Sequence, residues 1–317
     1  MKRILATMLT LTLALALLAG CGSKTNDAAN DPQPGNQEEQ TNIPTYTPTE
    51  IRASNSARNL LTHHNTVAYT RTFTDSEGNI SGTVCEQYTM ADGLLQTNSA
   101  YTDETGNVIL SQQGHADSTY AGATYGLSGD GEKYMTLYPN NEMYEDSVDT
   151  WLAAIDEDSM TETVTGTSEQ DGAIIVTTRT EYRDEADLYE ETLYYIDPET
   201  DDLLYMEVTS YNTQDDSVVA VVKTEISYDA PVTFEAKPFE TIIADQDYCE
   251  VNLIVNPQQD DMTAYWYPVA HGTELTFVPF SDYTLYSDEE LTQVIDASLG
   301  IDISGEVCNI FAVPQQG

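Results

Sequence analysis

The chain has 317 residues, and 54 acidic residues against 11 Lys and Arg give it a formal net charge of −43 at neutral pH. So negative a surface repels nucleic-acid phosphates and anionic lipid headgroups, which excludes a nucleic-acid partner and electrostatic attachment to a membrane. Hydrophobic residues make up 40% of the chain and 21 residues are tyrosine, which excludes a wholly disordered protein.

The first 20 residues have the pattern of an export signal. Lys2 and Arg3 precede an apolar run that is short for a transmembrane helix. The run ends in Leu-Ala-Gly-Cys at residues 18–21, which resembles the lipobox of bacterial lipoproteins. The resemblance implies that residues 1–20 are a lipoprotein signal peptide. It also implies that Cys21 is acylated, with palmitate for example, and anchors a Gram-positive-type surface lipoprotein to the extracytoplasmic face of the cell membrane.

Residues 21–46 are almost entirely small and polar, with Gly, Ser, Asn, Gln, Glu, Pro and Thr. Such a composition cannot bury a core, so we expect a disordered tether. About 25 residues of this kind span roughly 25–30 Å on average, enough to hold a folded domain clear of the lipid headgroups.

A helix is predicted over residues 48–64. Thr47 is followed by proline and then by Glu50, the arrangement of a capping box. Leu60 and Leu61 share one side of this helix with alanines one turn and more before them.

Beyond the helix the hydrophobic period changes from helical spacing to two. Strands of about ten residues alternate with Gly- and Asn-containing turns over residues 67–138 and again over 160–228. Between these runs, the spacing of Val148, Trp151, Leu152 and Ile155 predicts a short helix over residues 147–157. The fold class is therefore mainly β, with a curved antiparallel sheet or half-barrel, an N-terminal helix and an inserted helix.

This order of elements, together with the stretch 193–204, resembles the lipoprotein carriers of the Lol type. The stretch is similar to that family's strand, Asp-x-x-Thr-Gly turn and strand, with Asp201 or Asp202 where the family has glycine. The resemblance implies a half-barrel domain over residues 47–240, with a concave apolar surface that takes a lipid or another apolar ligand. Its candidate lining is Leu60, Leu61, Trp151, Leu152 and Ile155. The alternative is that these residues seal the sheet as ordinary core.

Residues 241–317 form the next predicted unit. The strand at 251–257, the Gly-Thr turn at 272–275 and the Tyr-Ser-Asp loop at 285–292 resemble the small β-grasp-like repeats of the internalin B-repeat type. The usual Gly-Trp-Tyr signature is missing. The resemblance implies a small β module that acts as a spacer or binds a partner.

Within this module, Tyr265 and Tyr267 lie on one face of a strand and Trp266 on the other. An aromatic platform for a protein or glycan partner is one interpretation. The other is that one face is core and the other is ordinary surface.

The three cysteines other than Cys21 are an odd number for an extracytoplasmic protein. Cys249 opens the first strand of the module and Cys308 lies in its last strand, so a disulfide between them would tie the ends of a small domain. Two buried free thiols are the alternative. Cys85 is then expected to be a buried strand thiol.

No sequence motif indicates catalysis. The segment 126–131 lacks both the nucleophile-elbow pattern and the lysine of a phosphate loop, and the four histidines have no metal-ligand spacing. We therefore expect no catalytic residue, no metal and no cofactor. The predicted function is a non-enzymatic, membrane-anchored extracytoplasmic lipoprotein that binds a lipid or other apolar ligand. The alternative is a cell-surface adhesion or sensing protein that binds a partner through the C-terminal module.

Overall fold

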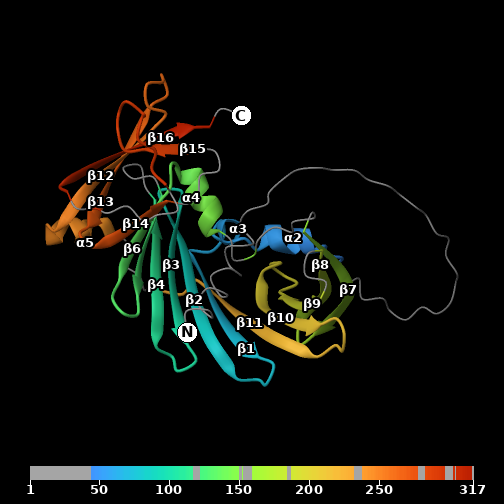
Figure 1. Ribbon diagram of the computed structural model, residues 1–317. Helices are drawn as coiled ribbons and strands as arrows, with labels where there is room; N and C mark the ends of the chain where they lie inside the picture. The colour runs from blue at the N-terminus through green and yellow to red at the C-terminus, as the bar shows by residue number, and fades with distance from the viewer. Residues whose placement is uncertain are drawn as a thin grey trace, which may run out of the picture. The chain divides into compact units, whose positions relative to one another are not determined.

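The computed structural model describes residues 44–116, 122–149, 152, 159–183, 187–231, 238–277, 283–296, 303 and 305–315. The protein is mainly β, with a large curved open sheet of twelve strands and a smaller sheet of four strands (Figure 1). This confirms the predicted fold class. The predicted signal peptide, Cys21, Trp151 and Ile155 lie outside the described residues.

The chain divides into two compact units, each built from two stretches of sequence. The first unit comprises residues 1–56 and 150–223, and the second comprises residues 57–149 and 224–317. Residues 241–317 thus belong to the same unit as the first strands of the chain. The separate domains at 47–240 and 241–317 stay a prediction.

Four strands of the first unit follow one another as a meander. Their order in the large sheet is β10-β9-β8-β7, and the bounds are β7 (Met160–Gln170), β8 (Ala173–Tyr182), β9 (Leu188–Ile196) and β10 (Leu203–Asn212). A turn at Asp171 and Gly172 joins β7 to β8, and both residues have positive φ, at 53° and 84°. Glycine adopts that conformation without a steric clash because it has no Cβ, and aspartate tolerates it better than most residues. This is why the pair is typical of a hairpin turn.

The single helix predicted over residues 48–64 is wrong, because the chain forms two shorter helices, α2 (Pro48–Ser54) and α3 (Ala57–Leu60). The predicted capping box of α2 is present, with the Thr47 hydroxyl accepting from the Glu50 amide. Asn55 is the C-cap residue of this helix, and its backbone N–H and its side-chain Nδ2 both donate to the Ile51 carbonyl, at 3.1 and 3.0 Å. Local bonds from an asparagine side chain to the backbone are favoured outside helix interiors.

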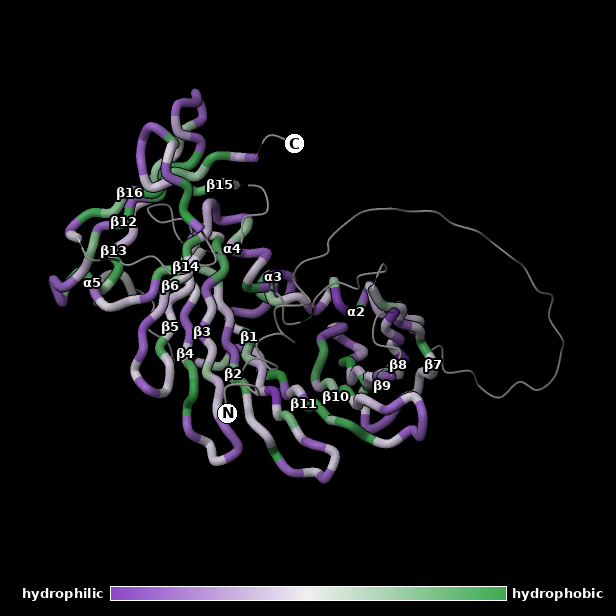
Figure 2. Tube along the Cα trace, in the orientation of Figure 1, coloured by the Kyte–Doolittle hydropathy of each residue, from purple (hydrophilic) through white to green (hydrophobic). Residues whose placement is uncertain are grey.

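The second unit contains most of the large sheet. The strand order is β14-β6-β5-β4-β3-β2-β1, and β11 (Val218–Tyr228) has residues in both units. The bounds are β1 (Thr66–Asp75), β2 (Ile80–Ala91), β3 (Leu94–Asp103), β4 (Val108–His115), β5 (Ala123–Ser128), β6 (Lys133–Leu137) and β14 (Thr273–Phe277). Figure 2 shows hydrophilic residues at the turns that join β1 to β2 and β3 to β4.

The small sheet also belongs to the second unit. Its order is β13-β12-β16-β15, with β12 (Tyr248–Val255), β13 (Thr263–Ala270), β15 (Tyr283–Tyr286) and β16 (Val307–Pro314); α5 (Pro238–Asp245) packs against β12 and β13. One core cluster joins Met135 and Leu137 of the large sheet to Val251, Tyr267 and Ile310 of the small one. Pairing of β14 with β6 extends this connection, so the small sheet shares its core with β5 and β6.

Most of the predicted helix at 147–157 lies outside the described residues, which include only 147–149 and 152 of that range. The helix that the structure describes here is α4 (Asn141–Val148), with the Asn140 side chain accepting from the Met143 amide at 2.8 Å. Asp149 follows as the C-cap residue. Asparagine is a favoured N-cap residue, and Asn140 marks the start of α4 seven residues before the predicted helix.

The predicted disulfide is absent, because Cys249 and Cys308 are both free thiols. The reason lies in the register: Cys308 is paired with Val251 across the parallel strands β12 and β16, two residues away from Cys249. Strand spacing then separates the two Cα atoms by about 8 Å, too far for a disulfide without backbone movement. The expectation of a buried Cys85 is also wrong, since this thiol is exposed.

Candidate functional site

Successive side chains of a strand point to opposite faces of the sheet, so β1–β6 of the second unit have two distinct surfaces. We call the side against which α4 packs the α4 face. Contacts of α4 define it: the Tyr88 hydroxyl donates to the Val148 carbonyl at 3.3 Å, and the Tyr144 ring lies against Gly114 and Gly122. The other side is called the opposite face.

The part of the α4 face next to α4 is filled by side chains. Tyr69 is 1% exposed, Tyr88 3% and Tyr144 0%. The rings of Tyr69 and Tyr88 meet edge to face with centroids 5.5 Å apart, a favourable aromatic geometry. A Cβ at Gly122 would overlap the Tyr144 side chain, so glycine is what permits this close packing.

Toward the turns at the far ends of β1–β4, the α4 face carries apolar and aromatic side chains that are only partly buried. They are Phe73 on β1, Tyr101 on β3, Leu110 on β4 and Tyr134 on β6. The register places Tyr101 directly opposite Leu110. We call these four residues the aromatic patch. Gly126 provides the space into which the Tyr134 ring packs.

An ion pair separates the filled part from the aromatic patch. Arg71 Nη2 lies 2.8 Å from Glu86 Oε2, and the two side chains are only 14% and 15% exposed. Burial acts to lower the pKa of Arg71, but the charge of Glu86 and the nearby tyrosines raise it overall. Burial, assisted by the charge of Glu86, raises the pKa of Tyr101 to about 12. Arg71 is therefore charged and Tyr101 is protonated at neutral pH.

Of the residues predicted to line a cavity, Leu60, Leu61 and Leu152 lie in the described part of the chain. Leu60 is 1% exposed and Leu152 is 6% exposed, so both are core residues, and Leu61 is half-buried. The amphipathic spacing of these residues predicts which side of a helix is apolar, but it does not distinguish a core residue from one that lines a cavity. The aromatic patch was missed because its members are spread over four strands, one residue at a time. Alternation along each strand was the signal that could have grouped them.

In the predicted aromatic platform, Tyr267 is fully buried and belongs to the core cluster, and its hydroxyl donates to the Tyr138 carbonyl at 3.4 Å. Tyr265 packs against the same cluster. Trp266 points to the other face, where its ring lies edge-on to Tyr248 at 6.4 Å. Only Trp266 of the three is thus directed away from the core.

The first unit has its own buried charge. The Glu162 side chain is fully buried and accepts hydrogen bonds from Arg52 Nε at 3.1 Å, Thr178 Oγ1 at 2.5 Å and the Tyr194 hydroxyl at 3.0 Å. Each carboxylate oxygen therefore has partners within the protein. This arrangement fixes α2 on the sheet and leaves no ligand-binding capacity at the carboxylate.

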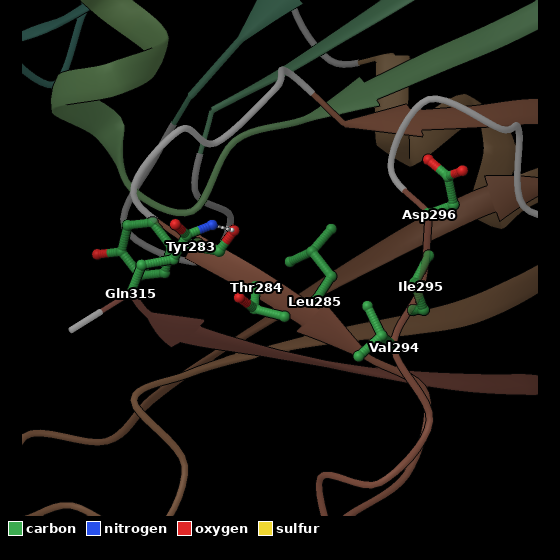
Figure 3. A pocket seen from close by; sticks show the side chains of 7 residues that line it. All are labelled: Tyr283, Thr284, Leu285, Val294, Ile295, Asp296 and Gln315. Atoms are coloured by element: carbon green, nitrogen blue, oxygen red, sulfur yellow. Dashed lines mark hydrogen bonds between the residues drawn. The ribbon is translucent and has the colours of Figure 1, made fainter. Parts of the chain in front are cut away.

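A shallow pocket of about 450 Å³ lies at the edge of the small sheet (Figure 3). Its lining includes Tyr283, Thr284 and Leu285 of β15 and also Val294. The Ile295 amide donates to the Leu285 carbonyl at 2.8 Å, so the neighbouring chain already covers part of this edge.

No protein-family model matches this chain. No curated protein matches it either. Among solved structures the chain is similar to MucB, with 14% identity over 58% of this chain and 58% of that chain and a TM-score of 0.32. It is similar to the Mycobacterium tuberculosis lipoprotein LppX, with 10% identity, coverage of 56% and 94% and a TM-score of 0.30. It is also similar to a putative outer membrane lipoprotein-sorting protein domain from Vibrio parahaemolyticus, with 8% identity, coverage of 61% and 95% and a TM-score of 0.27.

Similarities at this level leave the function to be argued from the chain's own residues. None of the helices in the described ranges has the length and apolar content that a bilayer crossing requires.

Proposed function

We propose that the protein is a non-enzymatic, extracytoplasmic lipoprotein that binds a lipid or other apolar ligand on the α4 face of the second unit. The observation that carries the proposal is the aromatic patch. Phe73, Tyr101, Leu110 and Tyr134 are partly exposed together on one surface, beside a sheet region whose other tyrosines are buried. Covering such partly exposed apolar surface with a ligand removes it from water, which lowers the free energy.

The ion pair gives the proposed site a polar end. Because Arg71 and Glu86 are mostly buried and neutralise one another, a ligand does not meet a net charge there. The protein as a whole is strongly acidic, which disfavours an anionic ligand. A neutral ligand with an acyl chain or a comparable apolar body therefore fits the patch best.

A neutral fluorescent dye, Nile red, tests this proposal. We expect it to bind the full chain with a saturating, one-to-one signal, and a neutral monoacylglycerol to displace it. Burying a phenylalanine side chain is worth about 1.5–3 kcal/mol, so Phe73→Ser weakens dye binding about tenfold or more.

The matched control is Val307→Ser. Val307 is 54% exposed on β16 of the small sheet, so its replacement also removes an exposed apolar side chain but leaves the aromatic patch intact. Equal dye affinity of Phe73→Ser, Val307→Ser and the unaltered protein would show that the dye does not bind at the patch.

The anchoring part of the proposal rests on the Leu-Ala-Gly-Cys sequence at residues 18–21. In a bacterial host that processes lipoproteins, we expect the protein in the membrane fraction and a mass increase on Cys21 from two or more acyl chains. Cys21→Ser abolishes that mass increase. An unmodified Cys21 in the purified protein contradicts the anchor.

A second candidate function is partner binding through the C-terminal module, by a protein or a glycan. The observation that favours it is the orientation of Trp266, which is partly exposed beside Tyr248 and away from the core that holds Tyr267. Trp266→Ala should then reduce capture of surface polysaccharide by the full chain, without affecting Nile red binding. Unchanged capture rejects this candidate.

A further inference from the structure

A second cavity of the second unit lies on the opposite face of the sheet. It measures about 610 Å³ and lies between β3–β6 on one side and α5, with the residues that follow it, on the other. That volume is within the range of small-molecule binding sites. Unlike the aromatic patch, this cavity is lined mainly by polar side chains.

Three of these side chains stand in one row across neighbouring strands. Asn98 on β3 is paired with Gln113 on β4, and Gln113 is paired with Tyr125 on β5. Paired residues on adjacent strands point the same way and are about 4.8 Å apart. The row therefore presents two amides and a phenol at regular intervals on the floor of the cavity.

A second row lies two residues further along β5. Leu127 on β5 is paired with Lys133 on β6, and both line the cavity. Leu127 is 40% exposed, so it offers an apolar surface beside the polar row. Asp245 at the end of α5 and Asp247 just beyond it line the other wall.

In the part of the chain that the structure describes, the polar side chains on the cavity floor have no partner. Within the described ranges, no hydrogen bond or ion pair involves the side chain of Asn98, Gln113, Tyr125 or Lys133. The three on the floor are nonetheless partly buried, and burial raises the pKa of Tyr125. Partly buried donors and acceptors that are left without protein partners are ready to bond to a ligand, since satisfying them costs no existing contact.

We propose that this cavity binds the ring of a neutral saccharide. The amides of Asn98 and Gln113 both donate and accept, which suits adjacent hydroxyls, while Asp245 and Asp247 accept from further hydroxyls. The Tyr125 ring and the Leu127 side chain offer apolar surface to the carbon–hydrogen face of the sugar.

Other ligand classes fit less well. Lys133 and two aspartates line the cavity, and Asp247 is already paired with His271 Nδ1 at 2.7 Å, so a phosphate or another anion meets no excess of positive charge there. A wholly apolar ligand would desolvate the amides without bonding to them, which costs free energy. A neutral molecule with many hydroxyls avoids both costs.

Isothermal titration of the full chain with cellobiose, maltose and N,N′-diacetylchitobiose tests the proposal. At least one of these sugars should bind. Loss of a hydrogen bond between ligand and protein then predicts about tenfold weaker binding for Gln113→Ala and for Asn98→Ala. Because neither side chain has a partner among the described residues, both variants should keep the urea midpoint of the unaltered chain.

Two controls make the result decisive. Gln170→Ala removes an exposed glutamine from β7 of the first unit, and Phe73→Ser alters the aromatic patch; both should leave saccharide affinity unchanged. The proposal is overturned if none of the three sugars binds at millimolar concentration. It is equally overturned if Gln113→Ala and Asn98→Ala bind as tightly as the unaltered chain.

Discussion

Replacing Glu162 by alanine should strongly destabilise the first unit. The carboxylate accepts from Arg52 Nε at 3.1 Å and Nη2 at 3.0 Å, and also from Thr178 and Tyr194. The Arg52 side chain is 19% exposed and the Glu162 side chain 0%. Glu162→Ala therefore removes the carboxylate of a mostly buried ion pair and the acceptor of Thr178 and Tyr194, and breaking such a pair costs about 3–5 kcal/mol.

The same unit offers a matched control, Glu181→Ala. Arg179 Nε lies 3.1 Å from Glu181 Oε1, but these side chains are 38% and 68% exposed. Water screens an exposed pair, so its loss should cost at most about 1 kcal/mol. The two variants remove the same residue type from the same kind of ion pair and differ mainly in burial.

Amide hydrogen exchange is the appropriate assay, because a whole-chain unfolding curve would mix the two compact units. We expect the free energy of opening at the Thr178 and Thr192 amides to fall by about 3–5 kcal/mol in Glu162→Ala and to change little in Glu181→Ala. The double variant Arg52→Met with Glu162→Leu should regain much of the loss, since apolar replacement of both partners removes both charges. Similar small effects of Glu162→Ala and Glu181→Ala would refute the reasoning.

Three further predictions concern single contacts. Gly122→Ala should destabilise the second unit by about 1–3 kcal/mol, measured by hydrogen exchange at the β5 amides, because a Cβ there overlaps Tyr144; no loss would mean that the ring moves aside freely. Thr47→Ala should lower the stability of α2 by about 1 kcal/mol, measured by hydrogen exchange, because the N-cap is lost. The control Thr47→Ser should keep most of that stability, since serine also caps helices. His271 should titrate above 6.5 by NMR, since the Asp247 hydrogen bond and then the Gly305 carbonyl raise its pKa. Its stabilisation is complete below pH 6.5 and is lost as the pH rises through the folded pKa, and a lower pKa in Asp247→Asn is the expected check.

The hairpin meander could be predicted because its signals are local. An aspartate followed by glycine, as at 92–93 and 171–172, adopts positive φ and turns the chain whatever lies elsewhere in the fold. Strand alternation is equally local. The capping box at Thr47 was found for the same reason, as its two partners are three residues apart.

The helix lengths and the site could not be read in the same way. Asn55 ends α2 partly because its Oδ1 accepts from the Leu203 amide at 2.8 Å, a contact across 148 residues of sequence. The register of Cys249 against Cys308 depends on parallel pairing of β12 with β16, which spacing along the chain does not encode. The same holds for the row of Asn98, Gln113 and Tyr125, since these residues meet only through strand register.

The central claim is that the aromatic patch on the α4 face holds an apolar ligand, and paramagnetic NMR with a neutral spin-labelled acyl ester tests it most directly. The account predicts strongest broadening of the amide signals of Phe73, Tyr101, Leu110 and Tyr134, with the signals of Val307 and its neighbours on β16 spared. Broadening that is absent at the patch, or equal at the patch and on β16, would contradict it.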